Sequence, residues 1–206
     1  MTWGEYAKIV IGLIVITDPL GAIPLFVGLT ANQSERERKR TADVASLSVA
    51  IILIVSCFVG EWILKIFGIS IASFRVGGGI LLLLLSVAMM QAKVIAAKQT
   101  EKEAEEATGK DHVAVVPLAI PLIAGPGAIS LSIIYAERVT GIVNTAFLVA
   151  SCVLVAAVMW AALRLSMRIS RVLGQTGINI ATRIMGLILA ALAIEFIASG
   201  YKVLFR

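Results

Sequence analysis

Apolar residues gather into six long runs along the chain, and short polar stretches separate most of these runs. Each run approaches the roughly 20 residues with which an α-helix crosses a hydrocarbon layer of about 30 Å. The pattern therefore predicts an all-α polytopic membrane protein with six transmembrane helices. We expect these helices at residues 8–31, 44–64, 72–92, 113–136, 141–163 and 183–201.

The composition supports a location in the lipid bilayer. Hydrophobic residues make up 59% of the 206 positions and charged residues only 15%, against about 45–50% and about 25% in soluble proteins. A chain with so few charges cannot cover a globule with an ordinary polar surface, so a soluble protein is excluded. The loops between the runs are too short to hold a further domain.

The basic residues concentrate in alternate loops. The loops after the first, third and fifth runs hold twelve lysines and arginines, and the opposite side holds six. Because basic loops stay in the cytoplasm, both termini are predicted to face outward and the long polar segment 93–112 to lie in the cytoplasm. Loop placement also explains the net charge of +5, and we expect no nucleic-acid partner.

Two pairs of similar segments relate the two halves of the chain. GAIPL at 21–25 returns as GAISL at 127–131, and RVGGGIL at 75–81 resembles RIMGLIL at 183–189. Each half holds three spans, an odd number, so the second copy enters the membrane in the opposite orientation. Residues 1–92 and 113–206 are therefore predicted to be two inverted-topology repeats, an arrangement of many secondary transporters, joined by the polar linker 93–112.

Every proline of the chain falls in the first span of one half or the other: Pro19, Pro24, Pro117, Pro121 and Pro126. Proline removes an amide donor and disfavours helix in the residue before it, and nearby glycines loosen the same stretches. The first helix of each repeat is thus predicted to be broken. Unwound backbone in hydrocarbon survives only where it lines a cavity, which favours a solute site at the midplane; simple kinks repaired by neighbouring helices are the alternative.

The candidate substrate-binding residues lie around these two breaks. A half-helix amino end suits a carboxylate, and freed carbonyl groups suit a cation or an ammonium group. The set comprises Thr17, Asp18, Pro19, Gly21, Pro24, Pro121, Gly125, Pro126, Gly127 and Ser130.

Two carboxylates in the predicted spans are candidates for coupling to a proton or a sodium ion. A charge inside the membrane is costly, so Asp18 is expected to be functional; it also suits a cap for the half-helix that begins at Pro19, and the two roles are compatible. Glu195, in the sixth span, either binds the coupling ion or pairs with a lysine or arginine near a helix end.

The strings DPLGAIPLF at 18–26, PLAIPLIAGPGAIS at 117–130 and RIMGL at 183–187 resemble the MarC family of bacterial inner-membrane proteins. The resemblance spans the whole chain and implies a six-helix protein of the inner membrane, grouped with LysE-type exporters, that moves small neutral amino acids. The motif residues that carry over are Asp18, Pro19, Gly21, Pro24, Pro121, Gly125, Pro126 and Gly127. Glu195 lies outside these motifs.

The expected function is therefore secondary transport of small neutral amino acids or similar small polar solutes. A structural or partner-binding membrane subunit is the alternative, and a membrane-embedded enzyme is a weaker one, because the single histidine, His112, lies in the polar linker and no motif for nucleotide binding or hydrolysis occurs. No cofactor and no metal are expected. Substrate identity, direction of transport, coupling ion and homo-oligomer formation stay open.

Three further features are expected to serve packing. Cys57 and Cys152 lie within apolar runs, where cysteine commonly acts as a small buried hydrophobe. The glycines at 77–79 lie within the third span, and glycine in a membrane helix lets a neighbouring backbone come close.

Overall fold

The computed structural model describes residues 3–31, 33–91 and 124–205. All regular secondary structure in these ranges is helical, which confirms the all-α prediction for the part of the chain that is described. The helices are α1 (Trp3–Thr17), α2 (Ala22–Leu29), α3 (Glu35–Ile66), α4 (Ile71–Met90), α7 (Pro126–Arg138), α8 (Ile142–Arg164) and α9 (Ser166–Leu204).

Four of these helices are long and apolar enough to cross a membrane by themselves, namely α3, α4, α8 and α9. The helices α1 and α2 together make a fifth candidate span, bent by 43° where they meet. The described part of the chain thus holds four or five candidate spans. The first part of the predicted fourth span, residues 113–123, lies outside the described residues, and α7 covers most of the rest.

Large apolar side chains cover the outside of the bundle. Trp62, Phe67 and Leu84 are each more than 60% exposed. So many exposed large apolar side chains are unfavourable in water and are typical of a surface that contacts lipid or another protein. The exposed surface therefore agrees with the composition in placing these helices in a bilayer.

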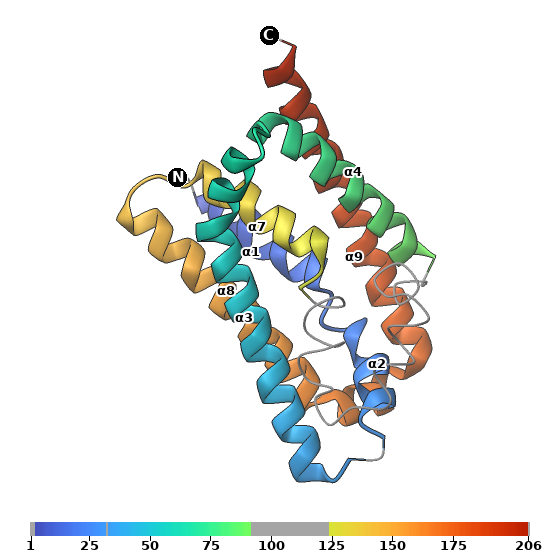
Figure 1. Cartoon of the computed structure of the whole chain (residues 1–206). Helices are drawn as coiled ribbons and strands as arrows, with labels where there is room; N and C mark the ends of the chain where they lie inside the picture. Colours follow the sequence, from blue (N-terminus) through green and yellow to red (C-terminus); the bar gives the residue numbers. More distant parts are fainter. Residues whose placement is uncertain (1–2, 32, 92–123, 206) are drawn as a thin grey trace.

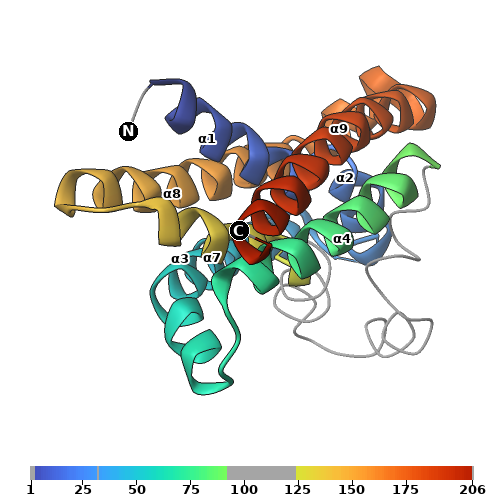
Figure 2. The ribbon, with the colours of Figure 1, turned by 90° about the horizontal axis from the view of Figure 1, so that it is seen from above.

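Helix α4 packs antiparallel along the second part of the longer helix α9 (Figures 1 and 2). Glycines make the close approach: a Cβ atom on Gly79 would lie 2.9 Å from the carbonyl oxygen of Ala193, and one on Gly200 would lie 2.7 Å from that of Ala72. The packing interpretation is confirmed for Gly78 and Gly79, which face α7 and α9, whereas Gly77 has open space beside it.

Helices α3 and α8 form a second antiparallel pair. Near one end of the contact the Sγ atoms of Cys57 and Cys152 lie 4.0 Å apart, and both thiols are buried and free. Near the other end Asp43 of α3 meets Arg164 of α8. The cysteines thus occupy the buried packing positions that were predicted for them.

Two helices extend beyond the predicted spans. Helix α3 begins at Glu35 because Ser34 and Glu37 form a capping box, in which Ser34 N donates to Glu37 Oε2 at 2.8 Å. Helix α9 begins at Ser166, so the segment expected as a loop before residue 183 is helical, with one break at Gly174 (φ 60°). Polar residues with good helix propensity continue a helix past its apolar run, and hydropathy alone therefore misplaced both starts.

Candidate functional site

The first predicted break is present between α1, which ends at Thr17, and α2, which begins at Ala22. Pro19 cannot donate a backbone hydrogen bond, and Asp18 adopts a positive φ of 46°, a left-handed conformation that aspartate and asparagine tolerate better than most residues. Asp18 is also buried, with an exposure of 1%. The chain therefore turns at a buried carboxylate.

The Asp18 carboxylate supports this turn directly. Gly21 N donates to Asp18 Oδ1 at 3.1 Å, and Ala22 N donates to the Asp18 carbonyl oxygen, also at 3.1 Å. A Cβ atom on Gly21 would lie only 2.0 Å from Asp18 Oδ2, so the carboxylate occupies the space where any larger residue would place its side chain. The predicted cap at Pro19 is not formed: helix α2 starts at Ala22, and its N-cap residue, Gly21, makes no side-chain capping hydrogen bond. The Asp18 carboxylate instead holds the turn before the helix.

Neighbouring candidates of the first break differ in what their side chains do. The hydroxyl of Thr17 donates to the carbonyl oxygens of Leu13 and Ile14, at 2.9 and 3.1 Å, and so completes the last turn of α1. Pro19 is buried, and Pro24 lies half-buried within α2. These residues shape the break, and Asp18 supplies its charge.

The described part of the second half brings a helix start to the same place. Gly125 precedes α7 in an extended conformation, and Pro126 is the first helical residue. A Cβ atom on Gly127 would lie 3.0 Å from Ile16 Cδ1, so the beginning of α7 packs against the last turn of α1. Helices leave their first amide groups without partners inside the helix, and α7 therefore directs such groups toward the region of the first break.

The remaining candidates of the second half occupy different surroundings. Gly125 and Gly127 are buried, whereas Pro126 is exposed. Ser130 is buried one turn into α7 and faces α4, where a Cβ atom on Gly78 would lie 3.4 Å from Ser130 Cβ. Pro117 and Pro121 lie outside the described residues.

Thr182 of α9 belongs to this region, although the sequence did not single it out. Its Oγ1 would lie 3.0 Å from a Cβ atom on Gly21. The residue is 3% exposed, and its hydroxyl has no hydrogen-bond partner within the described part of the chain. By contrast, the buried hydroxyls of Thr30 and Ser151 donate to carbonyl oxygens one turn earlier in their own helices. Thr182 therefore offers an unused hydroxyl beside the break.

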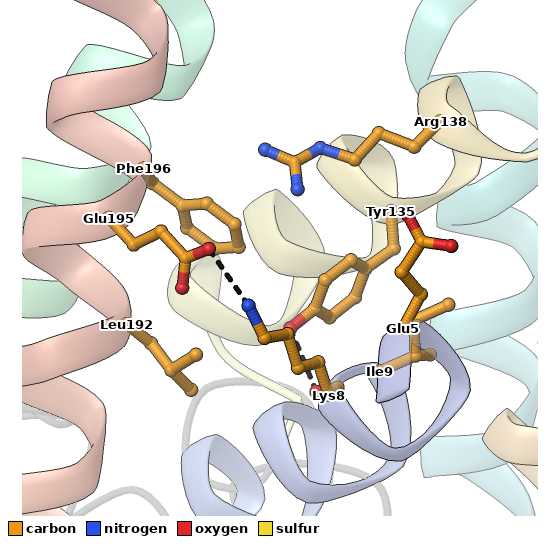
Figure 3. Close-up of a pocket in the computed structure, with 8 residues that line it drawn as sticks. All are labelled: Glu5, Lys8, Ile9, Tyr135, Arg138, Leu192, Glu195 and Phe196. Carbon is orange, nitrogen blue, oxygen red and sulfur yellow. Dashed lines mark hydrogen bonds and ion pairs between the residues drawn. The ribbon is translucent and has the colours of Figure 1, made fainter. Parts of the chain in front are cut away.

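Glu195 lies in a separate pocket at the end of the bundle that holds the amino-terminal end of α1 (Figure 3). Lys8 Nζ is 3.1 Å from Glu195 Oε1, and the hydroxyl of Tyr135 donates to the Lys8 carbonyl oxygen at 3.0 Å. The guanidinium group of Arg138 lies 5.6 Å from the ring centre of Phe196. The pocket has a volume of about 60 Å³, which is room for a few water molecules.

The two coupling candidates are far apart. Thr182, beside the first break, and Glu195 are thirteen positions apart on α9, which is about 20 Å along a helix that rises 1.5 Å per residue. Glu195 pairs with Lys8 and shares no contact with Asp18 that would join them in one site. Among the described residues no group of three or more histidines, cysteines, aspartates or glutamates could hold a metal ion.

The fold and the broken first helix define a polytopic helical membrane protein. The chain matches the MarC family of integral membrane proteins over residues 3–205 and belongs to that family. This membership confirms the resemblance carried by the motifs at both breaks.

Similar proteins occur in bacteria and archaea. The UPF0056 membrane protein YhcE of Escherichia coli (strain K12) is 45% identical over 200 residues, covering 97% of this chain and 93% of the relative. A UPF0056 membrane protein of Pyrococcus abyssi is 36% identical (96% and 94% covered), and one of Aquifex aeolicus is 32% identical (100% and 99% covered). The names of these relatives describe them as membrane proteins and mention no transported solute. No solved structure matches the chain.

Proposed function

We propose that this protein is a secondary transporter of small neutral amino acids, or of similar small polar solutes, with its site at the midplane between two broken helices. The observation that carries the proposal is Asp18, a buried carboxylate in a left-handed turn between α1 and α2. A carboxylate inside a membrane is expensive and marks solute and ion pathways.

The chemistry around the break suits a zwitterion. The carboxylate of Asp18 can accept a hydrogen bond from an ammonium group, and the amino end of α7, which packs against Ile16, carries the positive end of a helix dipole that suits a carboxylate. The hydroxyl of Thr182 can contact either group. A neutral amino acid presents both charges within a few ångströms, so one site can hold it.

Six spans in two inverted repeats are part of the proposal. Helices at equivalent places in the two halves pack antiparallel: α4 with α9, through Gly79 beside Ala193 and Gly200 beside Ala72, and α3 with α8, through Cys57 beside Cys152. A two-fold axis in the membrane plane relates each helix to an antiparallel copy. The pairing supports the repeat and gives the two halves a shared surface on which to rock.

The arrangement of the helix ends supports a bacterial inner-membrane protein with both termini in the periplasm. In Figure 1 the termini lie toward the end of the bundle that holds the α3–α4 and α7–α8 turns, while the beginnings of α3 and α9 lie at the opposite end. That opposite end carries the basic residues of the predicted cytoplasmic loops, including Arg36, Arg40 and Arg171. Positive charge on the cytoplasmic side is the usual rule.

Coupling to a proton or a sodium ion is proposed to run through Asp18 first, with Glu195 as a second candidate. Protonation or sodium binding would neutralise the buried Asp18 carboxylate and so lower the cost of moving it between two states of the transporter. Glu195 already has the ammonium group of Lys8 beside it, which leaves it less available to a cation.

Transport by purified protein in lipid vesicles tests the proposal. Uptake and efflux of labelled glycine and alanine are measured for the native protein and for Asp18→Asn, because asparagine tolerates the left-handed turn and the substitution removes only the charge. We expect transport to fall about tenfold or more, the scale of a lost charge-assisted hydrogen bond.

Glu61→Gln is the matched control, since Glu61 pairs with Lys65 on the exposed side of α3, and it should transport normally. Normal transport by Asp18→Asn would remove Asp18 from the site. Failure of the native protein to move any neutral amino acid in either direction would contradict the proposed substrate class.

A further inference from the structure

A second pocket, of about 370 Å³, lies where the end of α8 meets the start of α9, beside the first turns of α3. This is the end of the bundle opposite the α3–α4 turn (Figure 1). Four cationic side chains and one carboxylate line it: Arg38, Lys39, Arg164, Arg168 and Glu35. The cations come from both halves of the chain.

Among the described residues, two of the four cations form ion pairs with carboxylates, and Glu35 also attracts the nearby Arg38. Lys39 pairs with Glu35 at 2.5 Å, and Arg164 forms two hydrogen bonds with Asp43, at 3.0 and 2.9 Å. Arg38 and Arg168 form no ion pair with any described residue. The pocket beside Glu195 is different, because Lys8 and Arg138 there share the lining with Glu5 and Glu195. The second pocket thus differs from the pocket beside Glu195 in its excess of positive charge.

The rim of this pocket is held in place and is partly apolar. The indole nitrogen of Trp160 donates to Asp43 Oδ1 at 2.7 Å, and the Arg164 guanidinium lies 5.2 Å from the Trp160 ring centre. Leu165 and Met167, which also line the pocket, are 46% and 41% exposed. A charged recess therefore borders exposed apolar side chains.

The position along α8 places this recess at the membrane surface. Arg164 is the last residue of the candidate span α8, and Trp160 lies one turn before it. Tryptophan is enriched at the level of lipid headgroups, and arginine at a helix end reaches the same level. The phosphates of lipids therefore lie at the height of the pocket, whereas a dissolved ion would gain nothing from the apolar rim.

We propose that this pocket binds the phosphate-bearing headgroup of an anionic phospholipid in the cytoplasmic leaflet. Arg38 and Arg168 contact the phosphate, as arginine in basic pockets between transmembrane helices does, and the acyl chains lie along Leu165 and Met167. The lipid joins the start of α3 in the first half to the α8–α9 corner in the second half, and so stabilises their contact. This role is independent of which solute the protein carries.

Thermal unfolding of the full-length protein in a zwitterionic detergent tests the proposal. Phosphatidylglycerol, phosphatidylcholine and inorganic phosphate are added separately to the native protein. Since a ligand of the folded form must raise the melting temperature, we expect phosphatidylglycerol alone to raise it at low concentration. An equal rise with phosphatidylcholine or with inorganic phosphate would overturn the assignment to an anionic lipid.

The variants locate the site. In Arg38→Gln/Arg168→Gln, the phosphatidylglycerol concentration that gives half the shift should rise about tenfold or more, the scale expected for two cations near a membrane surface. Arg36→Gln/Arg171→Gln removes the same charge from the same two segments, outside the pocket lining, and should respond like the native protein. An equal loss in this control would show general surface attraction and overturn the pocket. Arg168→Gln alone, at an exposed position, should show a smaller loss in the same direction.

Discussion

The backbone amide of Gly21 donates a hydrogen bond to Oδ1 of Asp18 at 3.1 Å, while Oδ2 lies 2.0 Å from the position that a Cβ atom on Gly21 would take. The position of the Asp18 side chain therefore depends on a glycine at position 21. Glycine leaves room for the carboxylate, because it has no side chain. The carboxylate in turn accepts a hydrogen bond from the Gly21 amide, which lies beyond the end of α1. The break is therefore a turn held by its own hydrogen bonds. It is not merely a helix that lacks one hydrogen bond at Pro19.

Gly21→Ala should disturb this structure. The added methyl group cannot coexist with the carboxylate in its present place, so we expect the Asp18 side chain to move, transport to fall at least about tenfold and stability to drop by roughly 1–3 kcal/mol. Gly28→Ala, within the helix that follows Gly21, is the control, because a Cβ atom there meets nothing within 4 Å; it should be neutral or slightly stabilising. Transport assays and thermal unfolding measure both effects, and equal behaviour of the two variants would contradict the prediction.

Thr182→Val tests the unused hydroxyl beside the break. The substitution keeps the shape of the side chain and removes a buried polar group that has no partner within the described residues, so stability should stay unchanged or rise by about 1 kcal/mol. Transport should fall severalfold if the hydroxyl contacts the solute. Thr30→Val removes an equally buried hydroxyl that donates to Phe26 and should leave transport unchanged. A Thr182→Val protein with native transport would place Thr182 outside the solute path.

The Lys8–Glu195 pair should contribute little to stability, because its side chains are 60% and 48% exposed and exposed ion pairs are worth about 0–1 kcal/mol. Lys8→Gln and Glu195→Gln should therefore unfold within about 1 kcal/mol of the native protein. Their transport distinguishes the roles of Glu195. A coupling role predicts that only Glu195→Gln loses the dependence of transport on a proton or sodium gradient, and a merely structural pair predicts that both variants keep it.

Gly79→Ala should weaken the contact between α4 and α9. A Cβ atom at this position would lie 2.9 Å from the Ala193 carbonyl oxygen and 3.1 Å from the Ile197 amide nitrogen, and backbone atoms cannot move aside cheaply. We expect a loss of roughly 1–3 kcal/mol in thermal unfolding. Gly77→Ala, two positions away with open space beside it, should not destabilise the protein. If Gly77→Ala were destabilised and Gly79→Ala were not, the close contact between Gly79 and α9 would be contradicted.

Local chemistry explains which parts of the fold and site could be predicted. The break at Asp18 and Pro19 was predicted because a proline withdraws an amide wherever it stands in a helix, and the start of α7 at Pro126 follows from the same rule. The starts of α3 and α9 were placed too late, since hydropathy reports where a helix meets lipid and not where its hydrogen bonds begin. The start of α3 is indicated in the sequence by Ser34 and Glu37, whose spacing is that of a capping box.

Contacts between distant helices could not be predicted in the same way. Thr182 resembles the other buried hydroxyls in sequence, and only its position beside Gly21 distinguishes it. The sequence alone cannot say which basic residue lies near Glu195, because Lys8, which is 3.1 Å away, comes from the opposite end of the chain. The pocket lined by Arg38 and Arg168 likewise needs two segments that the sequence keeps far apart.

The order of residues along the chain determined that this protein is helical, lies in a membrane and interrupts its first helix at a buried carboxylate, because apolar runs and prolines act on their immediate neighbours. Tertiary structure decided which hydroxyl lies beside Gly21, which cation pairs with Glu195 and which arginines line one pocket. Those outcomes depend on how whole helices pack, and packing is set by the summed shape of many side chains and not by any one residue.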